Sequence, residues 1–222
     1  MSLKKLIAAA LLAGLFAAFL TAGFHWLFTE PLIDRAVEIE AQSAAHAEEP
    51  VVGRPMQKVG LFAGFVLYGV AWGVLFGVLA YAAPELAAGK ARAFLLALML
   101  GWSVALFPAL KYPANPPGVG EAETIGYRQE LYVLTIALVL AGGVAALLAH
   151  ERLRRSGRNL IAAVALAYAL YLVIVYAALP PNPDPVKVDA EMVGRFRLLS
   201  FAGQLLFWTA LGGAFWGLTR RA

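Results

Sequence analysis

Acidic and imidazole side chains gather in the first polar stretch of the chain, directly after its first apolar segment. Six carboxylates and two histidines lie within the 25 residues from His25 to Glu49. Carboxylate oxygens and neutral imidazole nitrogens suit Co²⁺, Ni²⁺ and Zn²⁺, and the lack of cysteine excludes thiolate ligands. The candidate metal ligands or capture residues are His25, Glu30, Asp34, Glu38, His46, Glu48 and Glu49. The alternative is a solvated acidic loop that binds no metal, because runs of charge usually face water.

The spacing of three of these carboxylates predicts a short helix. Thr29 precedes a Glu-Pro pair, which is typical of a helix start with Thr29 as its cap. A helix from this point would place Glu30, Asp34 and Glu38 on one face. His25 lies near the end of the preceding apolar segment, where it could serve as a ligand or gate. It could equally be an interfacial anchor that reaches water.

Proline stiffens two further polar segments, 107–120 and 180–185. Each proline ring fixes φ and removes a backbone donor, so these segments should follow rigid, extended paths. Rigid corners beside an acidic loop would form a vestibule that concentrates cations. We expect Lys111 to be ion-paired, because a free cation would repel the ion, and Arg128 to pair with nearby carboxylates or with those of the first loop. The vestibule residues are Lys111, Tyr112, Pro113, Asn115, Pro116, Pro117, Arg128 and Glu130.

The elements that must position these residues are long apolar segments. Of 222 residues, 61% are hydrophobic and 14% charged, whereas soluble domains average about 45–50% and about 25%. A spanning helix needs about 20 apolar residues and satisfies its own backbone hydrogen bonds in lipid. The sequence therefore predicts an all-α fold, a polytopic membrane helical bundle forming one integral membrane domain over residues 1–222. The six predicted spans are 6–28, 59–83, 93–110, 131–149, 160–179 and 198–219.

The distribution of charge predicts the orientation. If the N-terminus is cytoplasmic, the inner segments carry ten Lys and Arg residues against two acidic residues, and the outer segments carry eight against twelve. Lys and Arg are enriched in cytoplasmic segments. We therefore expect both termini inside (N-in/C-in) and the acidic loop outside. Because the basic residues lie at span ends, they indicate membrane topology and no nucleic acid partner.

Glycines recur at four-residue spacing in two of the predicted spans. Gly69, Gly73 and Gly77 form one ladder, and Gly213 and Gly217 form a second pair. Glycines on one helix face let two backbones approach closely in a membrane. Both sets are therefore expected to pack helices, either within the bundle or between protomers.

Motifs of catalysis and nucleotide binding are absent from the sequence. There is no GxxxxGK[ST], no GxGxxG after a strand, no HExxH and no nucleophile elbow. The chain is thus predicted not to be an enzyme and to hold no tightly bound cofactor. Any transport would draw on an ion gradient, the membrane potential or a partner.

The chain resembles the CbtA family of cobalt transporter subunits in its six-span form. The likeness rests on Thr-Glu-Pro-Leu-Ile-Asp at 29–34, Leu-Lys-Tyr-Pro-Ala-Asn-Pro-Pro at 110–117 and Gly-Arg-Phe-Arg-Leu at 194–198. The resemblance implies a multi-pass protein of a bacterial inner membrane that imports Co²⁺ for cobalamin synthesis, often beside a one-span CbtB-like partner. Members often carry several histidines in the first outer loop, where this chain has only His46. That difference favours carboxylates, or a partner subunit, over histidines as the residues that capture the metal.

These observations together predict a divalent metal transporter subunit, with Co²⁺ as the transported ion. Its expected partners are the lipid bilayer, a CbtB-like subunit and a second copy of the chain. Two alternatives stay open. One is a permease for another divalent cation such as Ni²⁺, and the other is a non-transporting scaffold subunit for a partner permease.

Overall fold

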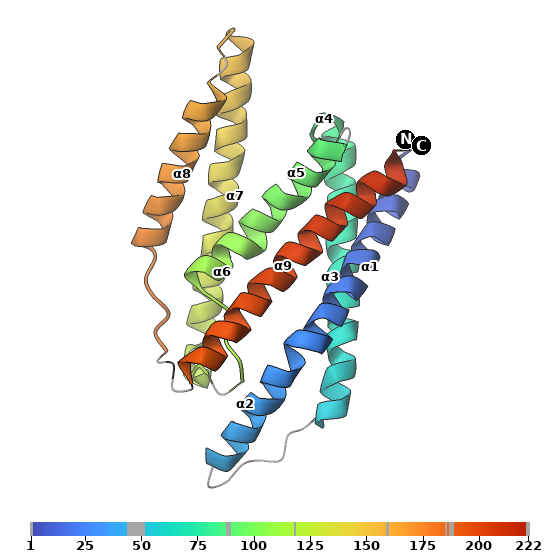
Figure 1. Cartoon of the computed structure of the whole chain (residues 1–222). Helices are drawn as coiled ribbons and strands as arrows, with labels where there is room; N and C mark the ends of the chain where they lie inside the picture. Colours follow the sequence, from blue (N-terminus) through green and yellow to red (C-terminus); the bar gives the residue numbers. More distant parts are fainter. Residues whose placement is uncertain are drawn as a thin grey trace. The chain divides into compact units, whose positions relative to one another are not determined.

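Helices make up nearly all of the computed structural model (Figure 1). The structure describes residues 2–43, 52–87, 90–117, 119–158, 160–184, 186 and 189–220, and within these ranges it contains no strand. Six helices are long and apolar enough to cross a membrane: Leu3–Phe28, Arg54–Ala82, Ala91–Lys111, Ile125–Arg155, Ile161–Ala178 and Ala190–Thr219. The predicted all-α class and the number of six spans are confirmed.

The third span is built from three consecutive helical pieces. A π-helical turn, η1, lies between α5 and α6, directly before Phe107 and Pro108. Proline lacks a backbone N–H, and its ring crowds the carbonyl four residues earlier, so a widened turn accommodates it. The full set of elements is α1 (Leu3–Phe28), α2 (Glu30–Ser43), α3 (Arg54–Ala82), α4 (Pro84–Ala87), α5 (Lys90–Gly101), η1 (Trp102–Leu106), α6 (Phe107–Lys111), the 3₁₀ turn η2 (Ala122–Thr124), α7 (Ile125–Arg155), α8 (Ile161–Ala178) and α9 (Ala190–Thr219).

Large apolar side chains cover the outside of the helices, while several polar ones lie within. Phe16, Leu67 and Val173 are each more than half exposed, whereas Thr21 and Thr135 are fully buried. Exposed apolar side chains on long helices are expected where lipid surrounds the protein. This pattern agrees with the membrane class predicted from composition.

The chain divides into two compact units. The first unit comprises Met1–Gly101, Ala114–Gly118 and Lys187–Ala222, and the second comprises Trp102–Pro113 and Val119–Val186. In the first unit, α1 packs against α3 and α9, and α5 packs against α9. The beginning of α1 and the end of α9 lie side by side, so these two helices run in opposite directions (Figure 1).

Glycines bring α1 and α3 into backbone contact. A β-carbon at Gly69 would lie 2.5 Å from the carbonyl oxygen of Gly14 and 2.6 Å from the β-carbon of Ala18. Gly73 and Gly77 face α1 in the same way, and a β-carbon at Gly73 would lie 2.8 Å from the carbonyl oxygen of Ala10. The predicted packing role of this ladder is confirmed, and it acts within the bundle.

On α9 the packing glycines are not the predicted ones. Nothing lies within 4 Å of a β-carbon placed at Gly213 or Gly217, so their expected role within the bundle is wrong. The neighbouring Gly212 packs instead, since its β-carbon would lie 2.9 Å from that of Ala97 on α5. One residue of helix turns the side chain by about 100°, which is enough to move a glycine from the buried face to the lipid face.

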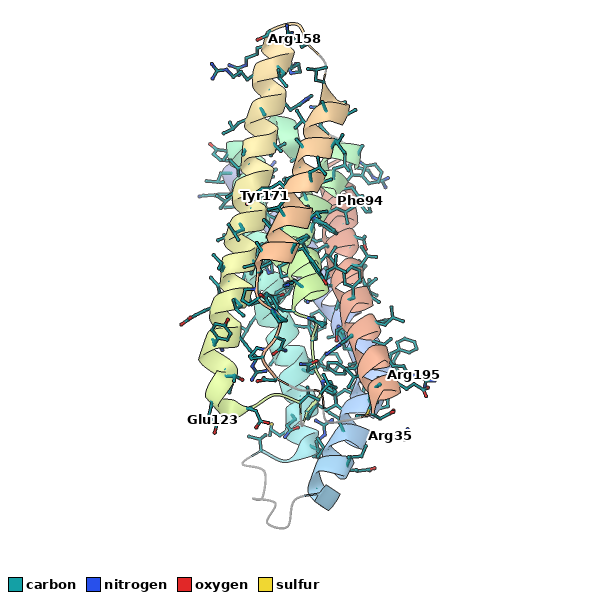
Figure 2. The ribbon with its side chains drawn as sticks, turned by 90° about the vertical axis from the view of Figure 1, so that its left-hand side faces the viewer. Arg35, Phe94, Glu123, Arg158, Tyr171 and Arg195 are labelled. Atoms are coloured by element: carbon teal, nitrogen blue, oxygen red, sulfur yellow. The ribbon has the colours of Figure 1, made fainter. Side chains whose placement is uncertain are left out.

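The second unit contains the hairpin of α7 and α8 together with η1, α6 and η2. Figure 2 shows Arg158 at the tip of this hairpin and Glu123 at the opposite end of α7. Phe107, Val139 and Leu172 belong to its buried apolar cluster, against which Trp102 and Tyr112 pack. Tyr112 of the first proline-rich segment is therefore anchored on an apolar core.

Candidate functional site

His25 is buried in the first unit, where α1 meets α9. Its Nδ1 lies 2.8 Å from the Thr29 hydroxyl oxygen, and its ring stacks on Phe65 of α3 with centroids 5.3 Å apart. Its other nitrogen, Nε2, faces Gly203, where a β-carbon would overlap it. With only 9% of its surface exposed, the imidazole does not reach out to water as the anchor interpretation requires.

Thr29 joins α1 to α2. Its backbone N–H donates to the His25 carbonyl, and its own carbonyl accepts from Leu32 and Ile33, so helical hydrogen bonding continues through the junction. The helix start predicted at Glu30 is confirmed. The Thr29 hydroxyl, however, bonds to His25, and thereby links the first residues of α2 to the buried imidazole.

Two basic residues of α3 hold the first two carboxylates of α2. Arg54 Nη2 donates to Glu30 Oε2 and to Asp34 Oδ1, and Lys58 Nζ lies 2.7 Å from Asp34 Oδ2. We call Glu30, Asp34, Arg54 and Lys58 the Arg54 cluster. The Glu30 side chain is only 6% exposed, whereas that of Asp34 is 39% exposed. The hydrogen bonds from Lys58 and then Arg54 lower the pKa of Asp34 below its usual value, so this carboxylate stays ionised in mild acid.

The structure brings together some of the predicted metal residues. Glu30 and Asp34 share the Arg54 cluster, which lies one helical turn from His25, while Glu38 is exposed on α2. His46, Glu48 and Glu49 lie outside the described residues. Within the part of the chain that the structure describes, no three His, Asp or Glu side chains are grouped to hold a metal ion. The metal site therefore stays a prediction.

Arg54 and Lys58 are functional candidates that the sequence reasoning missed. They are four residues apart at the start of α3 and therefore share one helix face. Two basic residues in this spacing, close after an acidic segment of matching period, could have suggested the pairing. In this structure, Glu30 and Asp34 are thus paired with two cationic side chains.

Hydrogen bonds and cation–π contacts of Lys111 hold the proline-rich segments of the second unit. Lys111 Nζ donates to the Tyr176 carbonyl at 2.8 Å and lies 4.8 Å from the centre of the Tyr176 ring. Tyr112 donates its hydroxyl to the Pro180 carbonyl at 2.7 Å. The expected ion pair of Lys111 is therefore wrong, because a carbonyl and an aromatic face take its charge instead.

Asp184 is the centre of a polar cluster in the second unit. Its side chain is 2% exposed and accepts hydrogen bonds from the Thr124 hydroxyl, at 2.8 Å, and from the Glu121 N–H. Arg128 Nε lies 3.0 Å from Asp184 Oδ2, and its Nη2 donates to the Glu121 carbonyl. Arg128 was expected to pair with a nearby carboxylate or with the first acidic loop. Its partner is instead a carboxylate of the last proline-rich segment.

The remaining vestibule residues are divided between the two units. In the first unit, Asn115 accepts hydrogen bonds from Arg197 of α9, and Pro116 is buried beside it in the chain. In the second unit, Glu130 is exposed on α7. Pro113 and Pro117 are partly buried, one in each unit. Polar contacts within one unit or the other thus hold each part of the proline-rich segments.

Asp184→Asn is expected to lower the free energy of unfolding by about 1–3 kcal/mol. The substitution keeps the shape of the side chain but removes the buried negative charge that pairs with Arg128. The measurement is the unfolding midpoint of the purified protein in mixed detergent micelles. Glu123→Gln is the matched control, since Glu123 is an exposed carboxylate beside Thr124. Equal midpoints for the two variants would contradict the assigned role of Asp184.

Comparison with known families gives one match that covers nearly the whole chain. A family model described as "Probable cobalt transporter subunit (CbtA)" matches residues 3–220. Comparison with curated proteins and with solved structures gave no match.

Proposed function

The chain belongs to the CbtA family, and from this premise we propose that it is the membrane subunit through which Co²⁺ enters the cell. The family description and the six spans support a multi-pass transporter subunit rather than an enzyme. The proposal adds the direction of transport, the use of cobalt in cobalamin synthesis and a location in a bacterial inner membrane. It also adds a CbtB-like one-span subunit as partner.

The charge balance of the Arg54 cluster is the observation that supports capture of a divalent ion. Arg54 and Lys58 together carry two positive charges opposite the two negative charges of Glu30 and Asp34. One Co²⁺ ion carries the same charge and accepts carboxylate oxygens as ligands. The ion could therefore replace the two side chains without leaving a carboxylate unpaired, which would be costly for the buried Glu30.

A stripe of polar groups leads from this cluster along α1. Thr29, His25 and Thr21 are spaced by four residues and so lie on one face of the helix. The Thr21 hydroxyl is fully buried and has no hydrogen-bond partner within the described chain. We assign this stripe to the inward path of the ion, with imidazole following carboxylate as the next ligand.

The basic end of the first unit supports the orientation that we propose for the protein in the membrane. Lys4, Lys5, Arg92 and Arg220 belong to the end where α1 and α5 begin and α9 finishes (Figure 1). We place this end in the cytoplasm, because Lys and Arg are enriched there. The Arg54 cluster then faces the exterior, where it would meet the ion first.

Uptake of radioactive Co²⁺ tests the proposal in cells that lack other cobalt transporters. Glu30→Gln/Asp34→Asn should lower the initial rate about tenfold or more, because two charged ligands are lost. Glu191→Gln is the matched control, since Glu191 is a well-exposed carboxylate at the start of α9. Unchanged uptake by the double variant at equal expression would remove the Arg54 cluster from the mechanism.

Purified protein in liposomes separates this function from the scaffold alternative. A transporter subunit that forms the path should admit Co²⁺ when the membrane potential is inside-negative, either alone or with its small partner. A scaffold should give no flux alone, and the Glu30→Gln/Asp34→Asn change should leave the flux of the complete complex unaltered. Competition by Ni²⁺ in the same liposomes measures the selectivity between the two ions.

A further inference from the structure

A groove runs along the α7–α8 hairpin of the second unit toward its tip. It has a volume of about 460 Å³ and is walled by Ala141, Ala145 and Ala149 of α7 and by Val164 and Ala167 of α8. The alanines are spaced by four residues, so they form one face of α7 about 12 Å long. Small side chains on both helices leave room for a thin, apolar occupant.

Two tyrosines complete the apolar wall of this groove. The Tyr168 hydroxyl donates to the Val139 carbonyl at 3.2 Å, and the Tyr171 hydroxyl donates to the Leu138 carbonyl at 3.0 Å. Because both hydroxyls bond to the α7 backbone, the rings are what remains to face the groove. The groove therefore suits hydrocarbon better than a polar solute.

A basic cavity adjoins the groove at the hairpin tip. Its volume is about 480 Å³, and Ala149 lines both cavities, together here with Arg152 and Arg155. Four arginines and one glutamate lie between residues 151 and 158. Glu151 pairs with Arg154 and Arg155, whereas Arg152 forms no ion pair with any other described residue. The tip thus keeps an excess of positive charge beside an apolar slot.

The tip presents these groups on a rigid turn. Gly157 has φ +75°, and the Arg158 N–H donates to the Leu153 carbonyl, which is the six-to-one bond of a Schellman motif. Among the described residues, no side chain caps the start of the following helix, α8, at Leu160. Backbone donors at a helix start favour an anion, as the arginines do.

We propose that the α7–α8 hairpin binds one anionic phospholipid, with its phosphate at Arg152 and Arg155 and an acyl chain in the alanine-lined groove. Basic pockets beside apolar helix surfaces bind the head groups of anionic lipids in membranes. The charge of the tip complements the phosphate, and the adjoining groove accepts the chain. This lipid site does not depend on the transport of cobalt.

Native mass spectrometry of the purified full chain tests this site. Phosphatidylglycerol and phosphatidylcholine with the same acyl chains are titrated in separate experiments. The wild type should bind phosphatidylglycerol about fivefold or more tightly than phosphatidylcholine, since each nearby basic residue favours an anionic lipid. Arg152→Gln/Arg155→Gln should bring the two affinities close together. Arg35→Gln/Arg195→Gln, at the exposed positions labelled in Figure 2, is the matched control and should keep the preference.

A groove variant separates a built lipid site from simple attraction of charge. Ala145→Phe should fill the groove and weaken both lipids by a similar factor, while the arginines stay intact. Ala145 is exposed to the groove, so folding should be retained, and circular dichroism checks this. The proposal is overturned if Ala145→Phe leaves phosphatidylglycerol binding unchanged, or if glycerol phosphate without acyl chains binds as tightly. Equal loss in the Arg35/Arg195 control would overturn it as well.

Discussion

Replacing Gly69 with alanine is expected to lower the free energy of unfolding by about 2–3 kcal/mol, although the same change at Gly60 or Gly64 should cost nothing. The added β-carbon would lie 2.5 Å from the carbonyl oxygen of Gly14 and 2.6 Å from the Ala18 β-carbon. The first of these neighbours is backbone, which cannot move aside by a change of rotamer. The two helices must therefore separate, and the close contacts of Gly73 with Ala10 weaken with them.

Gly60, Gly64 and Gly69 form a matched set, because all three lie on α3 and receive the same substitution. Nothing lies within 4 Å of a β-carbon at Gly60 or Gly64, and alanine is the better helix former by about 1 kcal/mol. Unfolding midpoints in mixed micelles should therefore rise slightly for Gly60→Ala and Gly64→Ala and fall for Gly69→Ala. A fall of equal size in all three variants would contradict the role assigned to the α1 crossing, because helix propensity alone would raise the midpoints.

The sequence predicts the helices well because a membrane imposes a simple rule. A segment that spans lipid must be long, apolar and internally hydrogen-bonded, and each requirement is visible in composition alone. The ends are less visible. Arg54 to Lys58 lies in the first turns of α3, and Glu191 and Arg195 lie in those of α9, because a helix continues into water where its charged residues pair.

The partners of polar groups depend on geometry that spacing does not contain. Arg54 meets Glu30 from 24 residues away in the chain, and Arg128 meets Asp184 across two helices. Judged from the sequence alone, many carboxylates of this chain could pair with either arginine equally well. The choice among them is fixed by the packing of apolar helices, which brings only one or two within reach. The same dependence explains why Gly212, and not Gly213, packs on α5.

His25 illustrates both the strength and the limit of the sequence. Its place near the end of a span marks it as unusual, but the same place suits an anchor and a ligand alike. The structure decides for burial, because Phe65 and Gly203 enclose the ring and Thr29 holds Nδ1. Gly203 itself carries no signal in the sequence, since its importance comes only from the imidazole of another helix.

Gly203→Ala is expected to lower Co²⁺ uptake about tenfold or more, because the added β-carbon would overlap His25 Nε2. The ring cannot simply turn away, since it is stacked on Phe65 and bonded to Thr29. It must leave its place, or α9 must move off α1. Initial rates of uptake, normalised to the folded protein recovered by size-exclusion chromatography, measure the effect. Gly213→Ala is the matched control on the same helix, and it should transport normally.

A double-mutant cycle then distinguishes a ligand on the ion path from a residue that only packs. In a His25→Ala background there is no imidazole for the new β-carbon to displace, so Gly203→Ala should cause little further loss of uptake or stability. If His25 serves packing alone, Gly203→Ala should lower the unfolding midpoint while uptake per folded molecule stays normal. That result would remove His25 from the proposed path and leave capture to the carboxylates of α2. A loss of uptake confined to variants that displace the ring would instead tie transport to the imidazole, because the control places the same methyl group on the lipid face of α9.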